Sequence, residues 1–298
     1  MNDPAHTVHA APPMPPRVDT HAHVFSKTLR LAQGRRYAPG YDATLDTYLA
    51  LLDERDIGHA VLVQPSFLGT DNSFLLDALA KEPHRLRGVA VVSPDTPEDE
   101  LVQMSRQGVT GVRLNLIGQP LPEVNAAPWQ ALWRRLSHLG WHVELHRQAS
   151  DLAPLVESLL EAGLPVVVDH FGRPDPDKGV ADPGFGDLLG FGASGGVWVK
   201  ISGAYRCAKP GSGFARDATF QLLDAFGPER LMWGSDWPHT QFEHAIDYGR
   251  SLATLLDMHL EPALADAILR TTPHGFYGFD REPAHASAPA TPILQRTS

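Results

Sequence analysis

The sequence predicts a single-domain (β/α)8 TIM barrel of the α/β class. Eight short runs rich in β-branched residues recur along the chain, and a helical pattern follows most of them. The runs start on average about 30 residues apart, which is the length of one βα unit. Eight such units in one domain are typical of this barrel. The rival fold, a doubly wound open sheet, has less support because no glycine-rich phosphate loop follows the first run.

The predicted strands and helices alternate along the chain. The strands cover residues 18–24, 60–66, 88–93, 111–116, 142–146, 165–170, 197–203 and 231–236. Apolar residues at helical spacing predict helices within residues 45–52, 74–79, 129–139, 220–226, 242–256 and 262–269. Thr96 before Pro97 predicts the start of a helix that ends near Gly108, and Asp151 is the expected cap of a helix that ends before Gly163.

Composition predicts the domain boundaries. Residues 1–16 are rich in proline and are expected to form a disordered leader, whereas residues 17–280 form the barrel. Residues 281–298 are rich in Ala, Pro, Ser and Thr and are expected to form a flexible tail. No low-complexity linker divides the middle of the chain, so one domain is preferred to two.

Charge and cysteine content exclude several classes of protein. The 298 residues carry a formal net charge of −10, whereas a nucleic-acid partner needs a surplus of Lys and Arg. The single cysteine, Cys207, excludes an internal disulfide and a cysteine zinc site. No apolar run is long enough to cross a membrane, and the first residues lack the apolar core of a signal peptide. We therefore expect a cytoplasmic protein, and the sequence leaves its oligomeric state open.

Polar residues end every predicted strand on one face. Side chains two apart on a strand share a face. Reading the strands at this period gives His21, His23, Gln64, Ser66, Ser93, Arg113, Asn115, Glu144, His146, His170, Lys200, Ser202 and Asp236. The carboxyl ends of barrel strands meet at one mouth, where active sites of this fold lie. A strand that runs out into solvent would also end in a polar residue, but the same result in eight strands favours a functional site.

Histidine accounts for 15 of the 298 residues, and four histidines lie at predicted strand ends. His21, His23, His146 and His170, together with Asp236, offer the donors for one divalent ion, zinc or manganese, and a carboxylate that can activate water. The HxH pair alone is weak evidence, so the prediction depends on the whole set. A two-metal site is disfavoured, because none of the five lysines lies on the predicted fourth strand to serve as a bridging ligand.

Two nucleophile-based mechanisms lack support in the sequence. There is no Gly-x-Ser-x-Gly motif, because the segment around Ser235 lacks the second glycine. Nothing marks Cys207 as a thiolate, and a small buried filler is the simpler interpretation.

Three segments resemble the signature motifs of the amidohydrolase-related TIM-barrel hydrolases. They are residues 18–25 (VDTHAHVF), 168–174 (VDHFGRP) and 233–239 (WGSDWPH). The similarity runs from about Arg17 to Asp280. Within that group, residues 63–72 (VQPSFLGTDN) and 111–115 (GVRLN) are similar to those of 2-pyrone-4,6-dicarboxylate hydrolases.

The resemblance implies hydrolysis of a small anionic lactone. In pyrone hydrolases the histidines that match His21, His23 and His170 polarise the lactone carbonyl, and the aspartate that matches Asp236 is the general base for water. The expected substrate contacts are Tyr37, Ser66, Arg113, Asn115 and Arg206. Arginine suits this task because one guanidinium can donate two parallel hydrogen bonds to a carboxylate.

The chain departs from the pyrone hydrolases at two positions. Gln119 stands where a second basic residue is expected after the fourth strand. His146 stands where a metal-independent pyrone hydrolase has a tyrosine, and it resembles the fifth-strand metal ligand of the wider superfamily. These differences favour a different lactone and a bound metal, and they leave metal-free operation open.

Two alternatives remain beside the lactonase hypothesis. A metal-dependent decarboxylase of an aromatic or muconate-type acid would use the same histidines and aspartate. A catalytically inactive barrel that binds a small acid would be stabilised by its ligand without turnover. The inactive barrel ranks lower because Asp236 and the histidines are all present.

Overall fold

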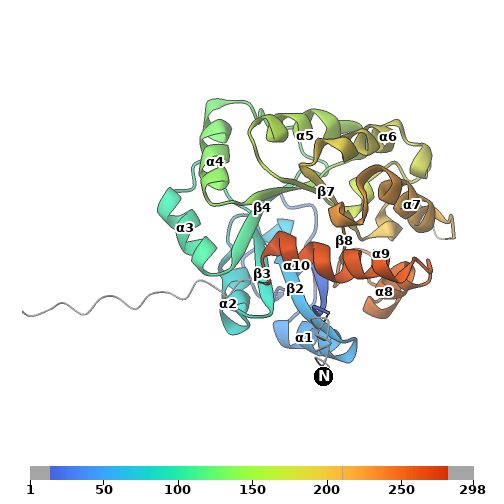
Figure 1. Ribbon diagram of the computed structural model, residues 1–298. Coiled ribbons are helices and arrows are strands. Elements are labelled where there is room, and N and C mark those ends of the chain that lie inside the picture. Colours follow the sequence, from blue (N-terminus) through green and yellow to red (C-terminus); the bar gives the residue numbers. More distant parts are fainter. Residues whose placement is uncertain (1–13, 210, 281–298) are drawn as a thin grey trace, which may run out of the picture.

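Eight parallel strands form the centre of the molecule. The computed structural model describes residues 14–209 and 211–280. Each strand pairs with its neighbours in sequence order, from β1 to β8 (Figure 1). The strands are β1 (Arg17–Ala22), β2 (Ile57–Val63), β3 (Leu86–Ala90), β4 (Val109–Asn115), β5 (His142–His146), β6 (Val166–Val168), β7 (Val197–Ile201) and β8 (Leu231–Trp233). The predicted (β/α)8 barrel is therefore confirmed.

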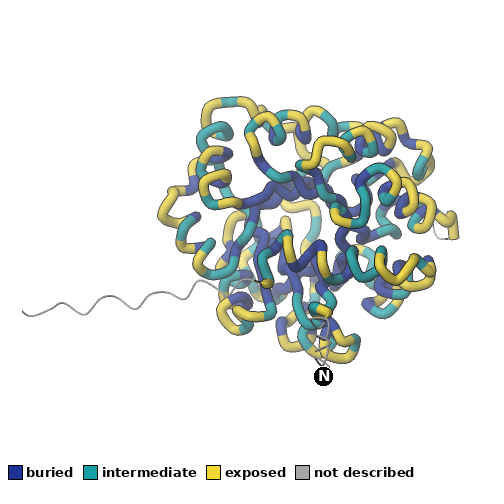
Figure 2. The backbone as a smooth tube through the Cα atoms, viewed as in Figure 1, coloured by how far each residue is buried: buried dark blue, intermediate teal, exposed yellow. Residues whose placement is uncertain are grey.

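Helices surround the strands, and buried residues concentrate in the strands and on the inner faces of the helices (Figure 2). The helices are α1 (Leu45–Glu54), α2 (Ser73–Lys81), α3 (Glu98–Arg106), α4 (Ala127–His138), α5 (Leu152–Glu161), α6 (Pro183–Gly190), α7 (Phe214–Phe226), α8 (Tyr248–Leu256), α9 (Pro262–Asp266) and α10 (Thr272–Tyr277). Leu132, Trp133 and Leu136 of α4 illustrate the pattern, because their spacing places all three on one buried face.

One end of the barrel is filled with apolar side chains and covered by α10. Val61, Val89, Val167 and Met232 pack inside the barrel together with Tyr277 of α10. The ring centroid of Tyr277 lies 5.5 Å from that of His142, the first residue of β5, so α10 covers the end where the strands begin. The polar residues at the strand ends therefore lie at the opposite, open end.

Several predicted strands were too long at their carboxyl ends. β1, β6, β7 and β8 stop before His23, His170, Ser202 and Asp236, which lie in the loops that follow. The reason is local for two of these residues: φ is +50° at His170 and +61° at Asp236. A strand cannot continue through a left-handed residue.

Two predicted helix caps were wrong. The Thr96 hydroxyl accepts a hydrogen bond from the backbone N–H of Ser93 (3.1 Å), so it stabilises the turn before α3 rather than the helix. Asp151 does precede α5, but its carboxylate pairs with Arg147 (2.6 Å) and does not cap the helix. The predicted helix over residues 242–256 begins later, at Tyr248.

The predicted tail and most of the predicted leader lie outside the described residues. Residues 14–16 are described, and the carbonyls of Pro15 and Pro16 accept hydrogen bonds from Arg270 (2.7 Å) and His274 (3.0 Å).

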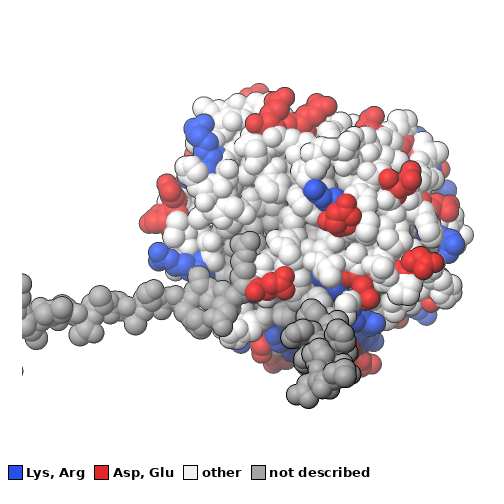
Figure 3. All heavy atoms as spheres, viewed as in Figure 1, with Lys and Arg blue, Asp and Glu red and all other residues white. Residues whose placement is uncertain are grey.

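Among the described helices, none has both the length and the apolar character needed to cross a bilayer. Acidic and basic side chains are scattered among uncharged ones on the face seen in Figure 3.

The seam between β1 and β8 closes the barrel close to the mouth. The Thr20 hydroxyl donates to the carbonyl of Trp233 (2.8 Å). Beyond the end of β8, the N–H of Asp236 donates to the His21 carbonyl (2.8 Å), and the N–H of His23 donates to the Trp237 carbonyl (2.8 Å). The hydrogen bonds that complete the barrel thus place His21 and His23 beside Asp236.

The buried carboxylate of Asp19 connects this seam to two helices. Its Oδ1 accepts the N–H groups of His21 (3.1 Å) and Ser235 (2.8 Å). Its Oδ2 accepts the hydroxyls of Tyr48 on α1 (2.8 Å) and Tyr248 on α8 (2.9 Å). Burial raises the pKa of Asp19, and hydrogen bonds from Ser235, His21 and Tyr48 oppose the rise by stabilising the charged form.

We predict that Asp19→Ala lowers the free energy of unfolding by about 3–5 kcal/mol, because four buried donors lose their acceptor. Urea denaturation followed by circular dichroism measures this change. Asp77→Ala, at an exposed position of α2, is the control and should change the free energy by less than about 0.5 kcal/mol. A loss below about 1 kcal/mol for Asp19→Ala would show that the seam does not depend on this carboxylate.

Candidate active site

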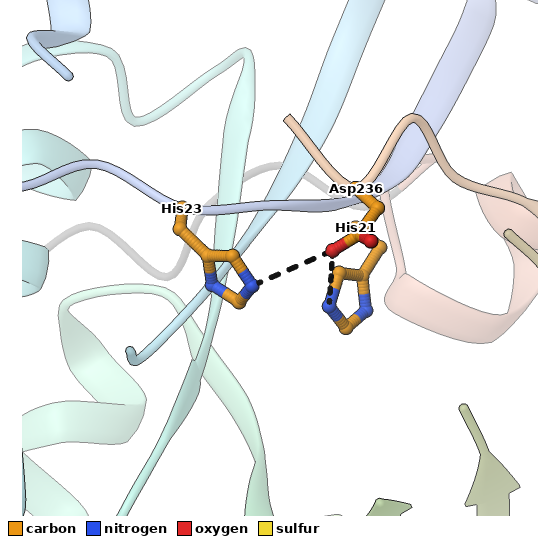
Figure 4. Close-up of side chains that lie close together, drawn as sticks. All are labelled: His21, His23 and Asp236. Carbon is orange, nitrogen blue, oxygen red and sulfur yellow. Dashed lines mark ion pairs between the residues drawn. The ribbon is translucent and has the colours of Figure 1, made fainter. Parts of the chain in front are cut away.

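Three imidazole nitrogens surround one carboxylate oxygen at the mouth of the barrel. The Nε2 atoms of His21, His23 and His170 lie 4.0, 3.9 and 3.9 Å from Oδ1 of Asp236. His21 is on β1 and His23 follows it, whereas His170 follows β6 and Asp236 follows β8. Figure 4 shows the His21 and His23 rings beside the Asp236 carboxylate. The structure therefore brings together the four residues that the sequence predicted as the catalytic group.

The tautomer of His23 follows from its second ring nitrogen. Nδ1 lies 2.7 Å from the carbonyl of Val63, which can only accept, so Nδ1 carries the proton and Nε2 carries a lone pair. Burial lowers the pKa of His23 to about 4 and that of His170 to about 3. These rings are therefore neutral near pH 7, and His23 directs a lone pair toward Asp236.

The donor set fits one metal ion. His21, His23 and Asp236 have donor atoms close enough to share an ion, and so do His21, Asp169 and His170. Nε2 of His21 is buried and has no hydrogen-bond partner, and a buried polar atom normally has one. Neutral imidazoles with a carboxylate are the ligands that zinc prefers. A backbone carbonyl behind a ligating histidine, as for His23, is the usual support for such a ligand.

His146 belongs to neither of these groups. Its Nδ1 lies 3.1 Å from Nη2 of Arg113, and a guanidinium can only donate. Burial and Arg113 lower the pKa of His146 well below its ordinary value, so the ring is neutral and carries its proton on Nε2. Nε2 has no partner in the protein, and His146 lines the pocket. In this arrangement His146 offers the pocket an N–H donor rather than a lone pair for a metal.

The second oxygen of Asp236 is held from the opposite side. Oδ2 accepts a hydrogen bond from Nε of Arg206 (2.6 Å) and another from the hydroxyl of Tyr205. Burial alone would raise the pKa of Asp236, but the Arg206 guanidinium lowers it well below its ordinary value. Asp236 is therefore ionised at neutral pH. Tyr205, which also contacts His239 (3.2 Å), was missed in the sequence, where nothing distinguishes it from its neighbours.

A layer of buried charges lies beneath this group. Lys200 pairs with Glu144, and Arg113 pairs with Asp169 (2.8 Å). Nδ1 of His21 lies 3.2 Å from the Lys200 ammonium and 3.3 Å from Oδ1 of Asp169. Burial and the neighbouring Asp169 raise the pKa of Glu144 to about 8. Lys200 and Glu144, although found at predicted strand ends, therefore contact His21 and each other below the pocket and do not line it.

The site opens into a pocket of about 190 Å³. Every expected substrate contact lines it: Tyr37, Ser66, Arg113, Asn115 and Arg206. Two further arginines line it, Arg36 and Arg173, which the sequence analysis did not single out. Arg173 lies within the recognised segment 168–174, but Arg36 lies between β1 and α1, where no motif marks it.

Some of the expected contacts are engaged within the protein. Arg113 is paired with Asp169, and Arg206 is paired with Asp236. The Tyr37 hydroxyl donates to Glu243 (3.0 Å), so the surface that Tyr37 offers the pocket is its ring and not its hydroxyl.

Cys207 is buried and its thiol donates to the carbonyl of His170, and burial raises its pKa to about 12. It is a structural residue, as expected.

Gly203 fits between two of the site residues. A Cβ built on it would lie 2.9 Å from Nδ1 of His170 and 3.1 Å from Oδ2 of Asp236, and its φ is +57°. Both the space and the backbone conformation therefore require glycine.

The sequence matches the family described as amidohydrolase over residues 18–279. A 2-pyrone-4,6-dicarboxylate hydrolase from Comamonas testosteroni is 34% identical over 253 residues, which cover 78% of this chain and 80% of the relative. A 4-sulfomuconolactone hydrolase from Hydrogenophaga intermedia is 32% identical over 234 residues, which cover 77% of each chain. A solved structure from Pseudomonas putida, named as a candidate 2-pyrone-4,6-dicarboxylic acid hydrolase, is 48% identical and has a TM-score of 0.85. That alignment covers 90% of this chain and 99% of the other.

We predict that Gly203→Ala shifts the His170 ring and the Asp236 carboxylate and costs about 1–3 kcal/mol more than its backbone strain alone. The control is Gly163→Ala, which has the same sign of φ (+74°) but no atom within 4 Å of the new Cβ. Urea denaturation compares the two losses of stability, and a crystal structure of Gly203→Ala locates the ring. Equal losses with an unmoved ring would refute the steric role of Gly203.

Proposed function

Since this chain belongs to the amidohydrolase family, we propose that it hydrolyses a lactone that carries anionic groups. The first candidate substrate is 2-pyrone-4,6-dicarboxylate, and a sulfonated muconolactone is the second, because named relatives act on these compounds. One observation carries the proposal. The ionised Asp236 lies among three neutral imidazoles, in a pocket that four arginines line.

The charges of the pocket favour an anionic ligand. Among the described residues, Arg36 and Arg173 have no carboxylate within 4 Å, whereas Arg113 and Arg206 each have one. Asp236 is the only carboxylate residue among the described residues that line the pocket. An anion that enters therefore finds cationic donors without counter-ions. This local surplus lies within a protein whose formal net charge is −10.

Asp236 is suited to be the general base. Arg206 and Tyr205 hold Oδ2, so Oδ1 is the oxygen free to accept a proton from water. The water oxygen then attacks the lactone carbonyl carbon and the ring C–O bond breaks. The released ring oxygen takes the proton that Asp236 accepted from water, which restores the carboxylate. The low pKa of Asp236 keeps the carboxylate ionised, and a general base must also lie within hydrogen-bond reach of the water.

A zinc or manganese ion held by His21, His23, His170 and Asp236 would polarise the carbonyl and lower the pKa of water. The lone pair on Nε2 of His23 supports this version, because a neutral ring in that tautomer cannot donate to an oxyanion. His146 has the complementary role. Its Nε2–H can donate to a substrate oxygen, and Arg113 keeps that proton in place by donating to Nδ1.

We predict that Asp236→Asn lowers kcat for 2-pyrone-4,6-dicarboxylate by about 100- to 10,000-fold, because the amide cannot accept the proton. Loss of pyrone absorbance measures the rate, and product analysis should find ring opening without carbon dioxide. Asp187→Asn, at an exposed position on α6, is the control. Near-wild-type turnover by Asp236→Asn would rule out this base, and carbon dioxide release would favour a decarboxylase.

We predict about one zinc or manganese ion per chain in protein purified without added metal, with loss of the ion in His23→Ala. Elemental analysis measures the content, and His138→Ala, an exposed histidine on α4, should retain it. Fully active protein that contains no metal would contradict the metal site while leaving lactone hydrolysis intact.

A further inference from the structure

We propose that Arg36 determines specificity by binding a second anionic group of the substrate, so that the pocket selects dianionic over monoanionic lactones. This inference rests on the proposed function, because it names the class of lactone that the site accepts. The juxtaposition of Arg36 with Asn115 at the end of β4, whereas Arg173 and Arg206 follow β6 and β7, carries it.

Arg36 reaches the pocket from the connection between β1 and α1. Its Nη2 donates to Oδ1 of Asn115, the last residue of β4, over 3.4 Å. A Cβ built on Gly118 would lie 3.4 Å from its Cδ, so the side chain runs along the loop that follows β4. Asn115 thus takes one of the guanidinium's five N–H donors. Arg36 lines the pocket and is also exposed to solvent.

Arg36 is held near other positive charges without a counter-ion of its own. Burial first, and then the charges of Arg113, Arg173 and Arg206, lower its pKa. Within residues 14–209 and 211–280, no carboxylate lies within the 4 Å that defines an ion pair with it. Two other arginines of the pocket differ in this respect, since Asp169 pairs with Arg113 and Asp236 pairs with Arg206. A bound anion would supply what Arg36 lacks.

Two other cations of the pocket, Arg173 and Arg206, come from other strand ends. Arg173 follows β6 and Arg206 follows β7, and Nη1 of Arg173 donates to the carbonyl of Arg206 (3.0 Å). Arg36 is instead tied to the end of β4, and the sheet order separates β4 from β7. Arg36 and Arg173 therefore enter one pocket from different strand ends, and neither has a carboxylate partner among the described residues. A ligand with two anionic groups offers one to each of them.

The test compares substrates across two neighbouring arginines. Arg36→Gln keeps a hydrogen-bond donor and removes the charge. Arg35→Gln is the matched control, because Arg35 is exposed, donates to the carbonyl of Ala32 (3.2 Å) and is not among the described residues that line the pocket. Steady-state kinetics use 2-pyrone-4,6-dicarboxylate and its two monocarboxylate analogues. Calorimetry measures binding of the dicarboxylate to Asp236→Asn and to the double variant that also carries Arg36→Gln.

We expect Arg36→Gln to raise KM for the dicarboxylate about 10- to 100-fold with little change in kcat. The charge-assisted contact binds the substrate and the transition state equally, so its loss weakens binding without slowing the chemical step. KM for at least one monocarboxylate should stay within about twofold, and Arg35→Gln should match the wild type. Equal effects on all three substrates, equal effects of the two arginine variants, or no effect would overturn the inference. If the wild type hydrolyses none of these lactones, the proposed function fails, and the calorimetric comparison still decides the role of Arg36.

Discussion

The active site depends on how β1 is joined to β8. The seventh strand pairing ends at Trp233, and the last closure is made by the Thr20 hydroxyl, the Asp19 carboxylate and backbone hydrogen bonds just beyond β8. The two segments that make these bonds, residues 19–23 and 233–237, contain His21, His23 and Asp236. Barrel closure and the geometry of the candidate site are therefore one constraint, because the backbone at His21, His23 and Asp236 cannot shift without changing hydrogen bonds that complete the barrel.

The buried charges around this seam have a common physical purpose. Three residues of the candidate site are each held on the side away from the group: a backbone carbonyl faces His23, Ser202 faces His170 (2.8 Å), and Arg206 faces Asp236. Below them, Lys200 lies against the carboxyl group of Glu144 and Arg113 against that of Asp169, so each buried cation has an acidic partner in a low-dielectric interior. The atoms that remain directed toward the pocket are therefore few and chemically defined.

The sequence was informative where chemistry follows a repeated pattern. Runs of β-branched residues located the eight strands, and side-chain alternation picked out the polar residues at their ends, among them the histidines and Asp236. Helix signals were weaker: Asp182 before Pro183 is a cap that opens α6, yet that helix was not predicted, and Thr96 has the same appearance without the function. Left-handed backbone at His170 and Asp236 and the tautomer of His146 depend on distant partners, which no local pattern reports. Arg36 was missed for the same reason, since its neighbour Asn115 is 79 positions away.

The placement of the arginines has a consequence for how substrate range can change. The imidazoles and Asp236 lie on or beside strands, whereas Arg36 lies farther along the β1–α1 connection and makes none of the hydrogen bonds that close the barrel. A loop exchange there could redirect the enzyme to another acid at little cost in stability. Homologues that share all the strand motifs would then differ in the substrates they accept. Assigning activity from those motifs alone would group enzymes that a single loop arginine distinguishes.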